Sequence, residues 1–104
     1  MVIDLAITYA DVAQQMKEKK LAKSWSLIKT VNGNYYARFH DVAVGNPEIY
    51  KVLAWFEADK GTKRTFSLNP ARRTATFTYY PVAGEDPDVD HARKLDHSSV
   101  FKRF

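Results

Sequence analysis

Aromatic and cationic side chains alternate along one stretch of the chain, SLIKTVNGNYYARFHDV, which covers residues 26–42. Asn32 and Gly33 stand between two runs that are rich in residues favouring β-strands. An Asn-Gly pair is typical of the two-residue loop of a tight hairpin, and such a loop would set Val31 opposite Asn34. In that register one face of the hairpin carries Trp25, Lys29, Tyr36, Arg38 and His40.

The chemistry that this predicted face could perform is the binding of single-stranded nucleic acid. Bases stack on aromatic rings while neighbouring cations hold phosphates, so interleaved rings and cations suit such a ligand. The alternative is a structural face, on which Trp25 packs beneath a loop and the charged side chains are solvated. The opposite face, with Ile28, Tyr35, Ala37 and Phe39, is the better candidate for the core.

Further cations occur in three clusters, of which the arginines could contact phosphates. The clusters are one group of lysines, Lys17, Lys19, Lys20 and Lys23, and two pairs, Lys63 with Arg64 and Arg72 with Arg73. The two pairs are expected at opposite ends of a second hairpin. They would form one patch only if the sheet curls or the protein dimerises, and solvated charge is the alternative. The predicted partner-binding residues are Trp25, Lys29, Tyr36, Arg38, His40, Lys63, Arg64, Arg72 and Arg73.

The sequence contains few residues or motifs that could serve catalysis or metal binding. It contains no cysteine, no glycine-rich phosphate loop, no His-Glu-x-x-His motif and no nucleophile elbow. A lone histidine such as His40 is a weak candidate for acid–base chemistry. The three aspartates of residues 86–90 have the spacing of a calcium loop, but His91 and His97 stand where that loop needs glycine and glutamate. We expect a non-enzymatic protein with no catalytic residue, metal or cofactor.

A helix is predicted within ITYADVAQQMKEKKLAKS, residues 7–24. Thr8 suits the N-cap position, and Asp11 stands three residues later, where it can complete a capping box. Lysines gather at the end of the segment, where cations complement the helix dipole. Four apolar residues recur at helical spacing and are expected in the core: Tyr9, Val12, Ala13 and Met16.

Residues 47–58 fit two different structures. Asn46 and Pro47 are typical of a helix start, and apolar residues at 49, 52, 53 and 56 would form its buried stripe. The crowding of Ile, Tyr, Val, Trp and Phe favours a strand instead. Asp59-Lys60-Gly61 also fits a three-residue hairpin loop that would pair Glu57 with Lys63. We predict the strand and keep the helix as the alternative.

A second hairpin is predicted in KRTFSLNPARRTATFTYYP, residues 63–81. Apolar and polar residues alternate on both sides of a turn in which Pro70 follows Asn69. One face of this hairpin is expected to be apolar. The other is rich in threonine, as in an antiparallel sheet with one solvated face.

The predicted fold class is α+β, with an N-terminal helix packed on an antiparallel β-meander of four to five strands and a short C-terminal helix or tail. Residues 1–84 are expected to form a single α+β domain. Residues 85–104 are expected to form an acidic loop and a C-terminal helix or tail. Phe101 and Phe104 suggest that this tail docks on the body of the protein or on a partner.

Charge and hydropathy narrow the range of partners. The chain has 104 residues and a formal net charge of +4, and residues 1–84 carry 12 Lys or Arg against 7 Asp or Glu. This balance favours an anionic partner. No apolar run is long enough to span a membrane, and the N-terminal residues lack the basic region of a secretory signal. We expect a cytoplasmic protein without a membrane partner.

The leading hypothesis is a small basic module that engages nucleic acid or a nucleoprotein complex through its basic and aromatic sheet face. The alternative is a protein-binding adaptor or inhibitor, of viral or mobile-element type. It would act through a sheet edge and exposed aromatic residues such as Trp55 and Tyr80. A homodimer, in which this sheet face is the subunit interface, is a further possibility.

Overall fold

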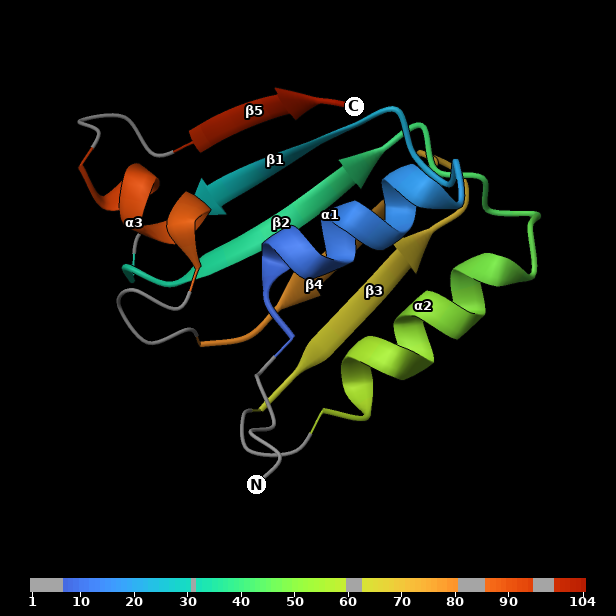
Figure 1. Cartoon of the computed structure of the whole chain (residues 1–104), viewed down its shortest axis with the longest axis horizontal. Helices are drawn as coiled ribbons and strands as arrows, with labels where there is room; N and C mark the ends of the chain where they lie inside the picture. The colour runs from blue at the N-terminus through green and yellow to red at the C-terminus, as the bar shows by residue number, and fades with distance from the viewer. Residues whose placement is uncertain (1–6, 31, 60–62, 81–85, 95–98) are drawn as a thin grey trace.

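The computed structural model describes residues 7–30, 32–59, 63–80, 86–94 and 99–104. Within these ranges the chain forms three helices and one antiparallel sheet with the strand order β3-β4-β2-β1-β5, so the predicted α+β class is confirmed (Figure 1). None of these helices is long and apolar enough to cross a membrane. The elements are α1 (Tyr9–Glu18), β1 (Ser24–Lys29), β2 (Tyr35–His40), α2 (Glu48–Glu57), β3 (Thr65–Asn69), β4 (Thr74–Thr78), α3 (Pro87–Arg93) and β5 (Ser99–Arg103).

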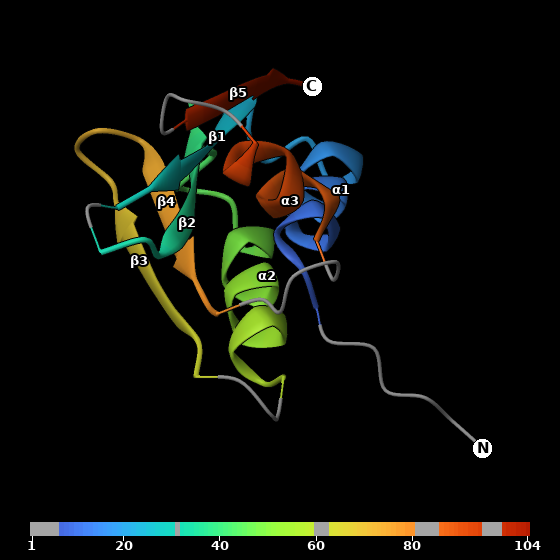
Figure 2. The same ribbon diagram turned by 90° about the vertical axis from the view of Figure 1, so that its left-hand side faces the viewer.

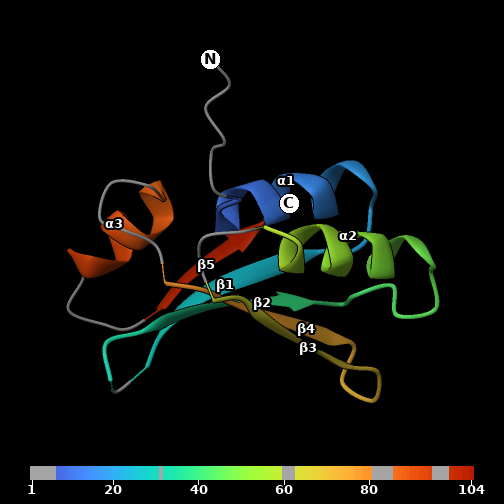
Figure 3. The same ribbon diagram turned by 90° about the horizontal axis from the view of Figure 1, so that it is seen from below.

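The helices lie together on one side of the sheet, and no described helix covers the other side (Figures 2 and 3). The core fills the space between the two layers. At its centre Phe77 meets the rings of Phe39 and Phe56 edge to face, with centroids 5.5 and 5.0 Å away. The sheet therefore has one buried face and one open face.

Helix α1 forms as the sequence predicts. The Thr8 hydroxyl accepts a hydrogen bond from the Asp11 N–H at 3.2 Å, and the Asp11 carboxylate accepts one from the Thr8 N–H at 2.8 Å. This reciprocal pair is the capping box. The four residues at helical spacing, from Tyr9 to Met16, are all buried, so the predicted core face is confirmed.

The strand predicted for residues 47–58 is wrong, because this segment forms helix α2. The Asn46 side chain accepts a hydrogen bond from the Glu48 N–H at 3.0 Å and so supports the first turn. Glu57 therefore cannot pair with Lys63 as a strand residue would. Helical spacing overrides the strand preference of single residues, since only a helix buries the whole apolar stripe on the sheet: Ile49, Val52, Leu53 and Phe56.

The first hairpin forms, but its predicted register is wrong by one residue. Thr30 and Asn34 are the last hydrogen-bonded pair, with 2.7 Å between the Thr30 nitrogen and the Asn34 oxygen, so three residues separate the partners instead of two. Gly33 has φ +84°, as expected for the left-handed residue that closes a three-residue loop. Trp25 consequently pairs with Phe39, not with His40. Because of this shift, each residue of β1 points to the side of the sheet opposite to the predicted one. The residues of β2 point to the predicted sides.

The second hairpin forms in the expected alternation. Phe66 pairs with Phe77 and Leu68 with Ala75, on the face that the helices cover. Pro70 lies in the turn between β3 and β4. Thr74, Thr76 and Thr78 alternate with the buried residues of β4 and are half-buried on the open face.

The described part of residues 85–104 belongs to the same sheet and core. Helix α3 begins at Pro87, within the segment predicted to be an acidic loop, and it buries Val89 and Ala92. Strand β5 pairs with β1 along its length and forms one edge of the sheet. The expected docking of the tail on the body takes the form of this added strand.

Candidate functional site

The open face of the sheet is the surface on which most of the predicted site residues meet. Its central row crosses all five strands, because Arg38 of β2 pairs with Ser26 of β1 and Thr76 of β4. Beyond these, Ser26 pairs with Phe101 of β5, and Thr76 pairs with Ser67 of β3. Paired residues in neighbouring strands point to the same side of a sheet, so these five side chains share one face.

The open face carries no carboxylate among the residues that the structure describes. Besides the central row, its side chains are Ser24, Ile28, Tyr36, His40, Thr65, Asn69, Thr74, Thr78 and Arg103. Hydroxyl groups, cations and aromatic rings therefore make up nearly all of its chemistry. Such a surface offers hydrogen bonds and positive charge to an anion and has no fixed negative charge that would repel one.

A hollow of about 360 Å³ lies on this face over β2, β4 and β3. Arg38 and Arg72 supply two guanidinium groups to it, and the Arg38 Nε donates a hydrogen bond to the Thr76 hydroxyl at 3.4 Å. A guanidinium group presents a planar set of donors that matches the oxygens of a phosphate. The rest of the lining is polar and comes from His40, Ser67, Asn69, Thr74 and Thr76.

Three rings stand on the same face, those of Tyr36 and Phe101 and that of His40, which lines the hollow. The guanidinium carbon of Arg38 lies 5.3 Å from the centre of the Tyr36 ring, which is half-buried. The Phe101 ring is 59% exposed and lies 6.4 Å from the His40 ring. The Nε2 atom of His40 is 3.2 Å from the Ser26 hydroxyl, which holds the imidazole against the sheet. Exposed rings among cations can stack against bases.

Two of the predicted site residues of β1 do not belong to the open face. Trp25 is 4% exposed, and its ring stacks on Phe39 with 5.5 Å between the centroids, so the prediction that it lies on the binding face is wrong. Lys29 pairs with Tyr35 at the end of β1, on the side of the helices, and its side chain is exposed. Both changes follow from the shifted register.

Arg64 is a structural residue in this fold, which contradicts its prediction as a surface cation. It is 8% exposed, forms an ion pair with Asp59 at 2.7 Å and donates to the Ile7 carbonyl at 2.6 Å. Its guanidinium also lies 4.7 Å from the centre of the Phe56 ring. A buried cation is stable only when it is paired and hydrogen-bonded in this way. Its neighbour Lys63 is exposed.

Arg72 and Arg73 are both exposed at the β3–β4 turn but line different hollows. Arg72 lines the hollow of the open face, and Arg73 lines a separate pocket at the end of the sheet. Phe101 and Arg103 of the open face were missed as site residues. Their alternation with Val100 and Lys102 in the last strand is the signal that could have identified them.

The arrangement can hold phosphates at Arg38 and Arg72 while presenting Tyr36 and Phe101 to bases. The described residues include no group of three or more metal-ligating side chains. No protein-family model, no curated protein and no solved structure matches the chain.

Proposed function

We propose that this protein binds single-stranded nucleic acid, free or within a nucleoprotein complex, through the open face of its sheet. The observation that carries the proposal is that the described residues of this five-stranded face include no carboxylate and combine guanidinium groups, aromatic rings and hydroxyls. The formal net charge of +4 supports an anionic partner.

Each chemical part of a single strand has a counterpart on this face. The phosphates would bind to Arg38 and Arg72 in the hollow, and the hydroxyl groups of residues such as Ser67 and Thr76 would add neutral hydrogen-bond donors. The bases would stack on the rings of Tyr36 and Phe101, since every base has a face that can stack. A single strand leaves its bases free to stack, whereas a duplex hides them.

The test is the double substitution Tyr36→Ala with Arg38→Ala, measured by fluorescence anisotropy with labelled oligothymidylate and oligouridylate at low salt. We expect the dissociation constant to rise by about 10- to 100-fold, because loss of stacking alone costs about 1–3 kcal/mol per base. Wild-type binding should also weaken steeply as salt is added.

The matched control is Tyr50→Ala with Lys51→Ala, which removes the same two kinds of side chain from the exposed surface of α2, on the helix side of the sheet. This variant should bind as the wild type does, and circular dichroism should show that both variants are folded. The proposal fails if micromolar wild-type protein binds neither oligonucleotide at low salt, or if the Tyr36/Arg38 variant binds as well as the control.

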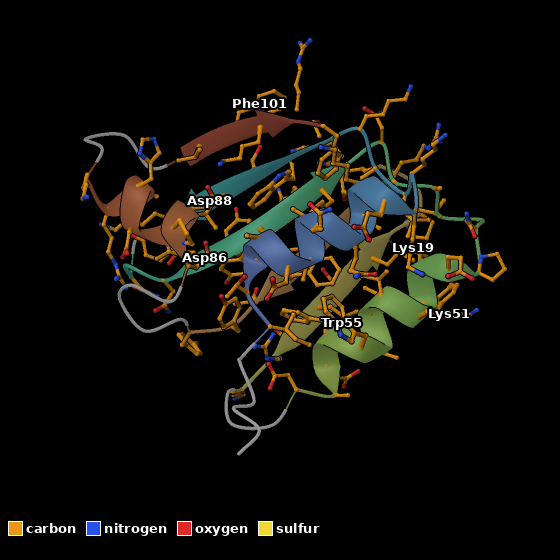
Figure 4. All side chains as sticks on the ribbon, in the orientation of Figure 1. Lys19, Lys51, Trp55, Asp86, Asp88 and Phe101 are labelled. Carbon is orange, nitrogen blue, oxygen red and sulfur yellow. The ribbon has the colours of Figure 1, made fainter. Side chains whose placement is uncertain are left out.

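A second candidate function, protein binding as an adaptor or inhibitor, is favoured by the exposed aromatic residues of α2. Trp55 is 37% exposed and Tyr50 is 59% exposed. Trp55 borders a shallow hollow of about 150 Å³ with Lys19 and Lys51, and Figure 4 shows these three side chains along α1 and α2. Partially exposed tryptophans are frequent hot spots of protein interfaces.

The second candidate predicts a protein partner that is retained in a pull-down after nuclease treatment and is lost with Trp55→Ala. Glu57→Ala is a suitable control, because Glu57 is also exposed on α2 but does not line the hollow beside Trp55. A partner that disappears on nuclease treatment would favour nucleic-acid binding instead.

A further inference from the structure

A second cation-lined pocket lies at the end of the sheet, separate from the hollow on the open face. Its volume is about 500 Å³. Four cationic side chains and one side-chain carboxylate line it, so the charge of its side chains is predominantly positive. The charged residues are Lys17, Lys20, Lys23, Arg73 and Asp41, and the ring of Phe104 also lines the pocket.

The backbone around this pocket has an unusual conformation. Lys20, Asp41 and Arg73 have φ values of +54°, +53° and +55°, and they are the non-glycine residues with positive φ in the described part of the chain. All three line the pocket. A side chain in this region costs about 1–2 kcal/mol relative to glycine. The chain thus keeps two cations at positions where glycine would be more stable.

The position of Lys20 shows how local structure creates this geometry. Lys20 follows the last turn of α1, where the Leu21 N–H donates to the Met16 carbonyl at 2.8 Å and the Lys20 N–H to the Lys17 carbonyl at 3.1 Å. This pair of bonds is the Schellman motif, whose left-handed residue is usually glycine. A lysine at that position is therefore not explained by the stability of the helix end.

The pocket and the hollow of the open face meet along one rim of the sheet. His40 and Arg72 line the hollow, while the residues that follow them in sequence, Asp41 and Arg73, line the pocket. The Val42 N–H donates to the Arg73 carbonyl at 2.8 Å, which ties the two chain segments together at this rim. A bound polymer that crosses the open face can therefore continue over the rim into the pocket.

We infer that the pocket holds a phosphate group of the same single strand that crosses the open face, so that the nucleic acid bends over the end of the sheet. This inference rests on the proposed function. Lys17, Lys20, Lys23 and Arg73 surround the phosphate, and Asp41 limits the excess of positive charge. Phe104, which is 38% exposed, offers a ring to the adjoining base.

The test uses the double substitution Lys20→Gly with Arg73→Gly. Glycine removes each charge and also relieves the left-handed backbone, so the variant should unfold at the same or a higher urea concentration than the wild type. Loss of binding then cannot be attributed to loss of the fold. Lys51→Ala with Lys94→Ala is the matched control, because it removes two exposed cations, one on α2 and one directly after α3.

Binding is measured with oligothymidylates of about four and about twelve nucleotides, within the range of site sizes for single-strand binders. We expect the variant to bind the long oligonucleotide less tightly than the control does. Its plot of log affinity against log salt should have a slope smaller by about 0.7, the value for one lost phosphate contact on a single strand. The short oligonucleotide should bind variant and control equally, because it occupies the open face alone.

Equal binding of the long oligonucleotide by variant and control would overturn the inference and leave the proposed function standing. The same loss for short and long oligonucleotides would also overturn it, since the pocket would then belong to one compact site. Failure of the wild type to bind either length would overturn the proposed function itself.

Discussion

At the scale of single residues, Asp86 is the clearest case of a side chain whose role only its surroundings reveal. It is fully buried, and its two carboxylate oxygens accept backbone hydrogen bonds from the starts of two helices. One bond comes from the Tyr9 N–H of α1 and the other from the Asp88 N–H of α3, both at 2.9 Å. Figure 4 shows Asp86 and Asp88 at the start of α3, beside α1. Asp86 therefore joins two helix N-termini.

We predict that Asp86→Asn lowers the free energy of unfolding at neutral pH by about 1–3 kcal/mol, the cost of leaving a buried polar group without its partner. An amide has one accepting oxygen, so either the Tyr9 or the Asp88 N–H would face another donor. Urea denaturation measures the change. Asp41→Asn is the control, because Asp41 is exposed and asparagine tolerates its positive φ. Equal stability of the two variants would contradict the role given to Asp86.

The pH dependence of the same substitution follows from burial, which raises the pKa of the Asp86 carboxyl. The folded protein therefore holds this proton more tightly than the unfolded chain, whose Asp pKa is about 3.9. The stability that comes from this tighter proton binding is full below that pH and is lost as the pH rises through the raised pKa, whereas the contribution of the two accepted hydrogen bonds remains. The difference in unfolding free energy between wild type and Asp86→Asn should be larger at about pH 4 than at pH 7. A difference that grows with pH would show that the pKa is lowered instead.

At the scale of elements, the β1–β2 turn decides which side chains reach the open face. Three residues separate Thr30 from Asn34, and Gly33 occupies the left-handed position. This loop pairs Ser26 with Arg38 and so sends Trp25 into the core. An Asn-Gly pair suits a two-residue loop equally well, and the burial of Trp25 is what favours the longer one.

We predict that Gly33→Ala lowers the free energy of unfolding by about 1–2 kcal/mol, the cost of a side chain at positive φ. A Cβ at Gly33 would meet no atom within 4 Å, so this cost is conformational and does not come from a clash. Gly45→Ala is a matched control, because that site is equally open and φ is not positive there. Both variants are measured by thermal or urea unfolding. If they are equally stable, the left-handed turn at Gly33 does not hold the register.

At the scale of the whole molecule, stability is expected to be uneven across the sheet. Strand β2 has a partner on each side and carries three buried residues, Tyr35, Ala37 and Phe39. Strand β3 forms an edge, and its side chains are mostly exposed. Regions with few buried contacts open more readily than the core. We therefore expect the open face to be most stable at its central strand β2 and to open more easily at its edge strand β3.

We predict that the amide protons of Ala37 and Phe39 exchange with solvent most slowly, and that those of β3 exchange much faster. Hydrogen exchange followed by NMR measures both rates under native conditions. The two strands serve as controls for each other, because they belong to one sheet and experience the same solution. Equal protection of β3 and β2 would mean that the sheet opens only by global unfolding.

Sequence patterns alone determined the α+β class, the capped helix α1 and the alternation of the second hairpin. Each depends on contacts between residues close in sequence, such as the reciprocal bonds of Thr8 and Asp11. The faces of β2 were also predictable, since Tyr36, Arg38 and His40 alternate with the residues of the core.

Tertiary structure decided the rest, because burial is a property of the whole fold. It made a helix of residues 48–57, where strand-favouring residues pack on the sheet as one apolar stripe. It also drew Trp25 into the core and enclosed Arg64 between Asp59 and two aromatic rings. Most importantly, it brought Arg38 and Arg72 into one hollow, and placed Arg73 with the lysines in and after the last turn of α1 in another. Residues distant in sequence meet only when the chain folds, so no local pattern could have located these two hollows.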